Sequence, residues 1–126
     1  MKLFNLQDRL IDFAVRIIKV TESLQRNGTT EHISKQLLRS GTSPAANYGE
    51  AQSAESRADF IHKLKIALKE LRETEVWLKI LLRSNLVQPK EKMLPLLTET
   101  DELISILFKS IDTAKENISK SGSKVN

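Results

Sequence analysis

Two histidines, His32 and His62, are the residues of this chain best suited to catalysis or metal binding. His62 follows Asp59 in the spacing Asp-x-x-His, which places a carboxylate and an imidazole on one helix face. Helical bundles that hold two metal ions need a second such motif and two further carboxylates. His32 follows Glu31 and has no carboxylate three residues before it, and the chain contains no cysteine. We therefore expect no metal site and no cofactor.

A second chemical pattern is Arg57-x4-His62, which resembles the RNA-cleaving motif of HEPN domains. The polar residue that usually follows the arginine is replaced by Ala58. A basic residue at this distance from a histidine is also common by chance in helices. The sequence favours a protein that is not an enzyme, with an endoribonuclease that uses Arg57 and His62 as the less favoured alternative.

Basic residues follow a helical period in two segments and predict two ridges of positive charge. The first ridge lies within an arc of about 80° on the helical wheel and contains Lys65, Lys69, Arg72, Lys79 and Arg83. The second ridge contains Arg9, Arg16, Lys19 and Arg26. Such ridges bind the phosphates of RNA or DNA without reading the base sequence, and no aromatic residues are interleaved for base stacking. The alternative is a solvated face balanced by Asp12, Glu73 and Glu75.

The composition indicates a single folded domain. The chain has 126 residues, of which 40% are hydrophobic and 29% charged, and its net charge is +4. Charges near the first residue leave no apolar run of the kind that a signal peptide needs, and no apolar stretch approaches the ~20 residues of a membrane span. We expect a cytoplasmic protein without a membrane partner, and the positive charge is compatible with an anionic partner.

Apolar residues recur every three or four positions in four segments, which predicts helices at about 5–26, 30–54, 57–85 and 89–118. Short connections between amphipathic helices favour an all-α, antiparallel, up-down-up-down four-helix bundle over residues 1–118. The segment 119–126 has no apolar period, so it is predicted to fray.

The Ser-, Gly- and Pro-containing stretch 39–51 is predicted to be helical, because a loop here would leave the neighbouring helices half uncovered. Its core side carries small residues, including Gly41, and Pro44 is expected to kink or tighten the helix. Polar residues form a strip beside this face, and we interpret them as an interhelical hydrogen-bond network rather than a ligand site: Arg39, Ser40, Ser43, Asn47 and Glu50.

The run Leu-Leu-Arg-Ser-Gly-Thr-Ser-Pro-Ala-Ala-Asn-Tyr-Gly-Glu-Ala-Gln, followed by Asp-Phe-Ile-His and Ala-Leu-Lys-Glu-x-x-Glu-Thr, resembles the bacterial 23S rRNA intervening-sequence protein family. The resemblance is close over residues 37–82 and departs from the family pattern at Pro44. It implies a four-helix bundle that assembles as a ring-like pentamer without a settled activity. The family is similar in fold to accessory proteins of diversity-generating retroelements, which bind a reverse transcriptase and nucleic acid.

A separate apolar arc of the third segment, formed by Ile66, Trp77 and Ile80, lies about 120° from its core face and predicts a contact between subunits. With the implied pentamer, this places Trp77 at or beside a subunit boundary. The sequence as a whole therefore predicts a non-enzymatic, oligomeric adaptor that binds RNA or DNA. The main alternative is a protein-binding scaffold for a nucleic-acid enzyme such as a reverse transcriptase.

Overall fold

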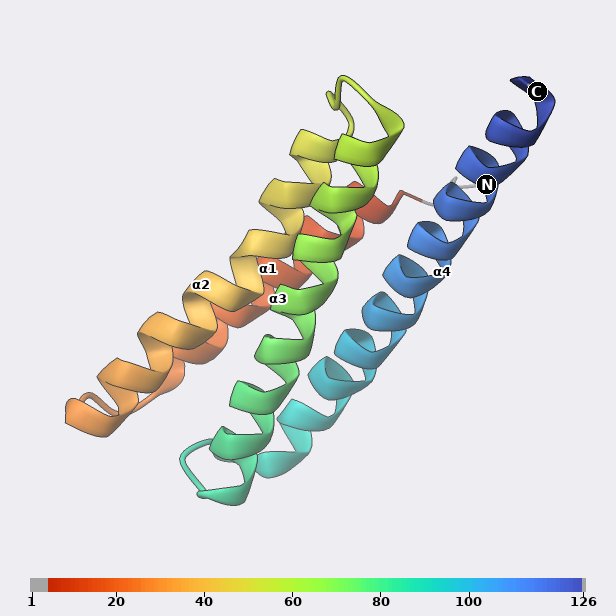
Figure 1. The fold of residues 1–126 in the computed structure, drawn as a ribbon. Coiled ribbons are helices and arrows are strands. Elements are labelled where there is room, and N and C mark those ends of the chain that lie inside the picture. The colour runs from red at the N-terminus through yellow and green to blue at the C-terminus, as the bar shows by residue number, and fades with distance from the viewer. Residues whose placement is uncertain (1–4, 126) are drawn as a thin grey trace.

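A computed structural model describes the backbone of residues 5–125 and the side chains of residues 5–119. Within this range the chain forms four α-helices, α1 (Leu6–Ser23), α2 (Gly28–Ala51), α3 (Arg57–Arg83) and α4 (Met93–Val125), and a short 3-10 helix, η1 (Lys90–Lys92), before α4. Successive helices run in opposite directions (Figure 1). The prediction of an all-α four-helix bundle is confirmed.

Side-chain caps decide where the helices begin. Asn5 accepts a hydrogen bond from the amide of Asp8 at 3.0 Å, and Ser56 accepts one from the amide of Asp59 at the same distance. Asn27 and Thr30 form a reciprocal capping box at the start of α2. Asn27-Gly28 therefore opens α2, and the helix begins at Gly28, two residues before the predicted start at residue 30.

Other helix ends also differ from the predicted boundaries, and α2 and α3 end at Ala51 and Arg83, two to three residues before their predicted ends. α1 ends at Ser23, because the backbone of Leu24 is already extended. α4 begins after η1 and is helical to Val125, beyond the predicted end at residue 118. The side chains after residue 119 lie outside the described residues, so the predicted fraying of segment 119–126 stays a prediction.

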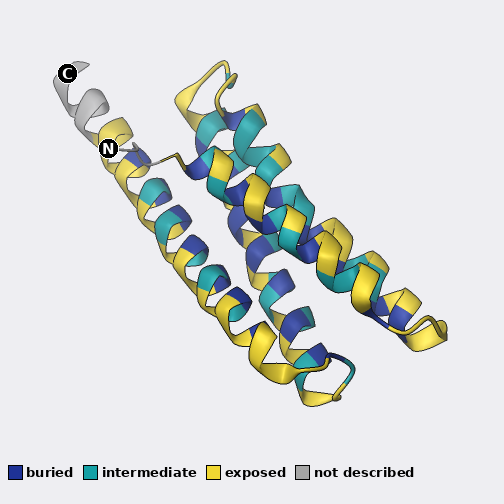
Figure 2. Ribbon diagram, turned by 180° about the vertical axis from the view of Figure 1, so that it is seen from behind, coloured by how far each residue is buried: buried dark blue, intermediate teal, exposed yellow. Residues whose placement is uncertain are grey.

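The core is a column of aliphatic side chains from all four helices, and the outer helix faces are exposed (Figure 2). α2 and α3 pack along their length, α4 packs on α3, and α1 packs mainly on α2, with few contacts to α4. The largest fully buried apolar side chains are Leu10, Phe13, Ile17, Leu37, Leu64, Leu71, Leu78, Leu81, Met93, Leu103 and Leu107.

The stretch 39–51 is helical throughout, as predicted, and Gly41 and Pro44 lie on its buried side. α2 continues without a break through Pro44. A Cβ atom built on Gly41 would lie 2.8 Å from the side chain of Ile17, so the missing side chain lets α1 and α2 approach closely. None of the described helices is long and apolar enough to cross a membrane.

Candidate nucleic-acid and assembly surfaces

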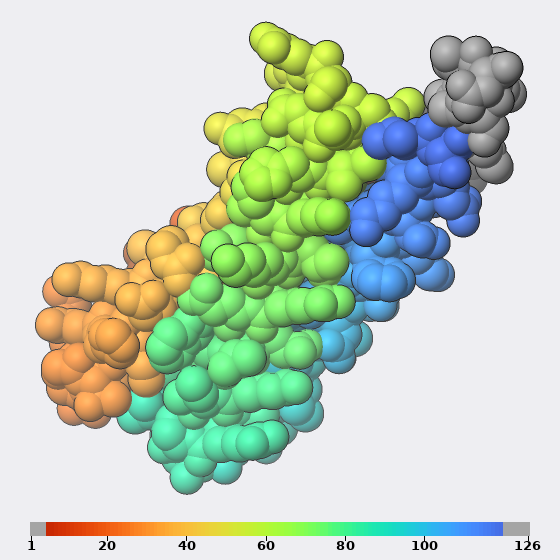
Figure 3. All heavy atoms as spheres, in the orientation of Figure 1, coloured from red at the N-terminus to blue at the C-terminus, as the bar shows by residue number. Residues whose placement is uncertain are grey.

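The basic ridge of α3 lies on the outside of the bundle. Its five members are all exposed: Lys65, Lys69, Arg72, Lys79 and Arg83. Lys79 makes an ion pair of 3.6 Å with Glu75. Within the described part of the chain, the other four members have no carboxylate within 4.0 Å. In Figure 3 the visible face is formed by α2, α3 and α4, and α1 is almost completely hidden behind them.

Two glutamates that interrupt this ridge in the sequence are paired elsewhere. Arg39 of α2 donates to Glu70 at 2.8 Å and also bonds to Glu73. The indole nitrogen of Trp77 donates to Glu73 at 2.9 Å. These hydrogen bonds, with that of Trp77 the larger cause, hold the pKa of Glu73 below its usual range even though burial opposes the shift. Both acids therefore form their ion pairs with Arg39, and neither lies within 4.0 Å of a lysine of the ridge, although the charge of Lys69 also helps to lower the pKa of Glu73.

Two acidic residues face each other between α3 and α4. The carboxyl groups of Glu75 on α3 and Asp101 on α4 lie close enough to interact. This contact and burial raise the pKa of Glu75, while Lys79 acts in the opposite direction.

The basic ridge of α1 is different, because Arg9 binds α4. Its guanidinium group donates to Glu99 at 2.9 and 2.6 Å and to Glu102 at 2.7 Å. The pKa of Glu99 is lowered mainly by this bond, and the pKa of Arg9 is raised by the same interaction. Arg16 is half-buried and Lys19 is exposed. The ridge of α1 therefore presents fewer free cations than the ridge of α3, and it faces a different side of the bundle.

The polar strip of α2 divides into two parts. Three of its residues reach α3: Arg39 through Glu70 and Glu73, Ser40 through the hydroxyl of Thr74 at 3.0 Å, and Glu50 through Lys63 at 3.1 Å. The other two bond within α2, because the amide of Asn47 donates to the hydroxyl of Ser43 at 2.8 Å and to its carbonyl at 3.1 Å. Among the described residues, no buried side-chain nitrogen or oxygen lacks a hydrogen bond.

The predicted subunit contact on α3 is partly covered within one chain. Ile66 and Trp77 are half-buried and Ile80 is exposed. Trp77 packs edge-on against the ring of His32 on α2, with ring centroids 6.1 Å apart. Val76 adds an exposed apolar side chain that sequence reasoning missed. These four residues, Ile66, Val76, Trp77 and Ile80, are called the α3 patch below.

A second exposed apolar surface lies on α1. Ile11, Val15 and Ile18 are 45%, 43% and 38% exposed, and their spacing of four and three residues aligns them on one helix face. We call these residues the α1 stripe. Periodicity places the core face of α1 at residues such as Leu10, Phe13 and Ile17, so three further apolar residues on this helix were a signal of a second apolar face. α2 packs against both α1, which carries the α1 stripe, and α3, which carries the α3 patch.

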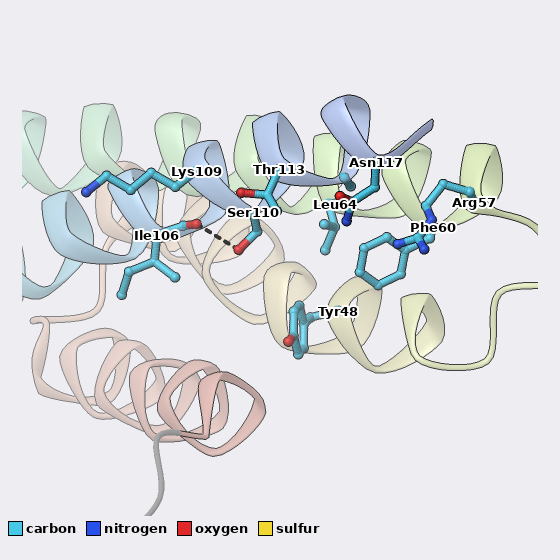
Figure 4. Close-up of a pocket in the computed structure, with 10 residues that line it drawn as sticks. Tyr48, Arg57, Phe60, Leu64, Ile106, Lys109, Ser110, Thr113 and Asn117 are labelled. Carbon is cyan, nitrogen blue, oxygen red and sulfur yellow. Dashed lines mark hydrogen bonds between the residues drawn. The ribbon is translucent and has the colours of Figure 1, made fainter. Parts of the chain in front are cut away.

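A groove of about 490 Å³ lies between α2, α3 and α4 near the beginning of α3 (Figure 4). Two aromatic and two basic side chains are among its lining residues, and none of the lining residues is acidic. The lining is formed by Tyr48, Arg57, Phe60, Leu64, Ile106, Lys109, Ser110, Thr113, Ala114 and Asn117. Of these residues, only Arg57 was a candidate for chemistry in the sequence.

The residues considered for catalysis are not joined in the described structure. Arg57 lines the groove, His62 does not, and no hydrogen bond or ion pair connects them. The backbone N–H of Asp59 donates to the hydroxyl of Ser56, which caps α3. Residues 5–119 contain no group of three or more His, Cys, Asp or Glu side chains that could hold a metal ion.

These features define an all-α four-helix-bundle protein with charged and apolar outer surfaces. The chain belongs to the 23S rRNA-intervening sequence protein family, whose model matches residues 4–109. It is also similar to a solved protein of unknown function from the S23 ribosomal protein family of Bacteroides thetaiotaomicron, with 40% identity and a TM-score of 0.76. That match covers 85% of this chain and 98% of the solved one. No curated protein matches the chain.

Proposed function

We propose that this protein is a non-enzymatic, oligomeric adaptor that binds the phosphate backbone of RNA or DNA through the outer face of α3. The observation that carries the proposal is a set of four exposed cations that form no ion pair within 4.0 Å among residues 5–119: Lys65, Lys69, Arg72 and Arg83. Each phosphate contact releases counterions from the nucleic acid, so binding of this kind is strong at low salt and independent of base sequence. We place this activity in the cytoplasm.

The charge balance of α3 supports this function. Acids interleaved with lysines normally weaken the field of a basic face. Here Arg39 from α2 pairs with both Glu70 and Glu73 and offsets one of their two negative charges, so the local field of the ridge is more positive than the sequence of α3 alone indicates. Arg39 therefore contributes to the proposed surface although it does not belong to the ridge.

The test is a fluorescence-anisotropy titration of the full chain with labelled duplex RNA and duplex DNA at low and high salt. We expect binding that weakens as salt increases and that differs little between sequences. No binding at low salt would overturn the proposal and favour a protein-binding scaffold. Cleavage of the RNA without added metal, lost in His62→Ala, would instead establish the endoribonuclease alternative.

We further propose that copies of the chain assemble by placing the α1 stripe of one copy against the α3 patch of the next. A twofold contact that paired one of these surfaces with its own copy would leave the other exposed to water. A head-to-tail contact covers both surfaces in every copy and closes into a ring when its rotation permits. The family resemblance implies a ring of five subunits. In the scaffold alternative, the same two surfaces bind a different protein, such as a reverse transcriptase.

A further inference from the structure

We propose that the groove between α2, α3 and α4 binds one unpaired nucleotide of a single-stranded RNA or DNA, with its base against the aromatic rings. The inference extends the proposed nucleic-acid function to a site separate from the ridge of α3. The ridge binds phosphates alone, whereas this groove would also bind a base.

The aromatic side chains come from two helices that meet only in the folded bundle. Phe60 lies on α3 and Tyr48 on α2, and both project into the groove (Figure 4). Each is half-buried and packs on the core, so each ring is held in place while part of it remains accessible. Stacking on such rings binds any base, because every base has a π-face.

The charges in the groove favour an anionic ligand. Arg57 lies beside Phe60 at one end, and Lys109 lies at the other end (Figure 4). Both side chains belong to exposed residues, and neither makes an ion pair within the described part of the chain. With no acidic side chain in the lining, the two cations can bind phosphates on either side of a stacked base.

The remaining polar groups suit a base better than they suit a fatty acid. Asn117 carries an amide, which offers both a donor and an acceptor to the edge of a base. Thr113 adds a hydroxyl, whereas the hydroxyl of Ser110 already donates to the carbonyl of Ile106 at 2.9 Å. A fatty acid would leave the amide and one cation unused.

The size of the groove indicates whether it binds single-stranded or duplex nucleic acid. A volume of about 490 Å³ lies within the range of small-ligand sites, roughly 300–1,000 Å³, and suits one nucleotide rather than a duplex. A base within a duplex is stacked and paired, so only a single strand presents its face at low cost.

The site is tested with a short single-stranded oligoadenylate and a protein labelled with ¹³C at tyrosine. Because the chain contains one tyrosine, every tyrosine signal in the NMR spectrum comes from Tyr48. We expect these signals to shift on titration and to saturate. We also expect Phe60→Leu, which keeps an apolar side chain but removes the ring, to weaken single-strand binding about tenfold.

Phe108→Leu is the matched control, because Phe108 is an exposed phenylalanine of α4 outside the groove lining. It should leave the single-strand affinity unchanged, and thermal melts should show that both variants are folded. The inference is overturned if the oligoadenylate binds without shifting the Tyr48 signals, or if both variants weaken binding equally. If duplex binding is retained in that case, the proposed function of the α3 ridge still stands. If instead duplex binding is absent while the Tyr48 signals shift as expected, only the proposed function of the ridge is overturned.

Discussion

Gly41 of α2 lies directly against Ile17 of α1: a Cβ atom at Gly41 would come within 2.8 Å of both Cγ atoms of Ile17. Ile17 is fully buried and β-branched, so its side chain has little freedom to move aside. The close approach of the two helices therefore depends on the absence of a side chain at residue 41.

We predict that Gly41→Ala destabilises the fold by about 1–3 kcal/mol, and Gly41→Leu by at least as much, through overpacking. Denaturant unfolding monitored by circular dichroism measures the effect. Gly28→Ala is the control, because nothing lies within 4 Å of a Cβ atom there and alanine is the better helix former. Equal stability of the Gly41→Ala variant and the wild type would show that α1 and α2 separate at no cost.

The hydroxyls of Ser40 and Thr74 form a buried pair that links α2 to α3 at 3.0 Å. We predict that Ser40→Ala costs about 0.5–1.5 kcal/mol of stability, and that Ser40→Ala with Thr74→Val costs less than the sum of the single changes. Thermal or denaturant unfolding of all three variants measures the coupling. Thr98→Val is the control, since the hydroxyl of Thr98 bonds only within α4. Additive costs would contradict a shared bond.

The contact between Glu75 and Asp101 makes stability depend on pH. A carboxyl whose pKa is raised in the folded state stabilises the fold below its unfolded pKa, and this contribution is lost as the pH rises through the raised folded pKa. Asp101→Asn removes the like charge and leaves the pair of Glu75 with Lys79. We predict a gain of ~0.2–0.5 kcal/mol at neutral pH, comparable to that for other like-charge pairs.

Unfolding at several pH values checks this prediction. The gain should shrink as the pH falls below the raised pKa of Glu75, because the wild-type pair is then protonated. Asp112→Asn changes an exposed acid of α4 without a partner among the described residues, and it should have little effect at any pH. A gain from Asp101→Asn that does not vary with pH would rule out the coupling.

Reversing three cations of the α3 ridge should weaken nucleic-acid binding and reduce its salt dependence. Each phosphate contact contributes about 0.9 to the slope of log K against log salt on duplex DNA, so the triple change Lys65→Glu, Lys69→Glu and Arg72→Glu lowers the slope by up to about 2.7. Anisotropy titrations over a salt series measure the slope. The control is the triple change Lys35→Glu, Lys92→Glu and Lys115→Glu, which alters the net charge equally at three exposed residues outside the ridge. Equal losses in both variants would indicate attraction by net charge alone.

Head-to-tail assembly predicts a specific result when two defective variants are mixed. Val15→Glu breaks the α1 stripe and Ile80→Glu breaks the α3 patch, so each variant alone should be monomeric. Mixed, they retain one intact pair of surfaces and should form a heterodimer. Light scattering measures these masses. Trp77→Glu also changes the α3 patch and should be monomeric, whereas Leu94→Glu, at an exposed apolar residue of α4, is the control and should assemble like the wild type. A monomeric wild type, or mixed variants that stay monomeric, would contradict the proposed contact.

The amino-acid sequence by itself determined the helices and their buried faces. Helical periodicity is a local property, so residues such as Leu10, Leu64 and Leu107 indicate the core without knowledge of their neighbours. The same reasoning predicted that the Gly- and Pro-containing stretch 39–51 is a helix with Gly41 on its core side. Helix ends were less certain, because Asn27 can close one helix or cap the next, and the hydrogen bond with Thr30 decides between them.

Only the tertiary structure decided which surface residues are free to bind. Arg9 and Lys65 are both members of basic ridges in the sequence, but Arg9 is held by Glu99, 90 residues away. The groove likewise brings together Tyr48, Phe60 and Lys109 from three helices, and no local pattern connects them. Partners so distant in the chain are set by how the helices pack, because helical periodicity determines which way a side chain faces but not which helix lies opposite it.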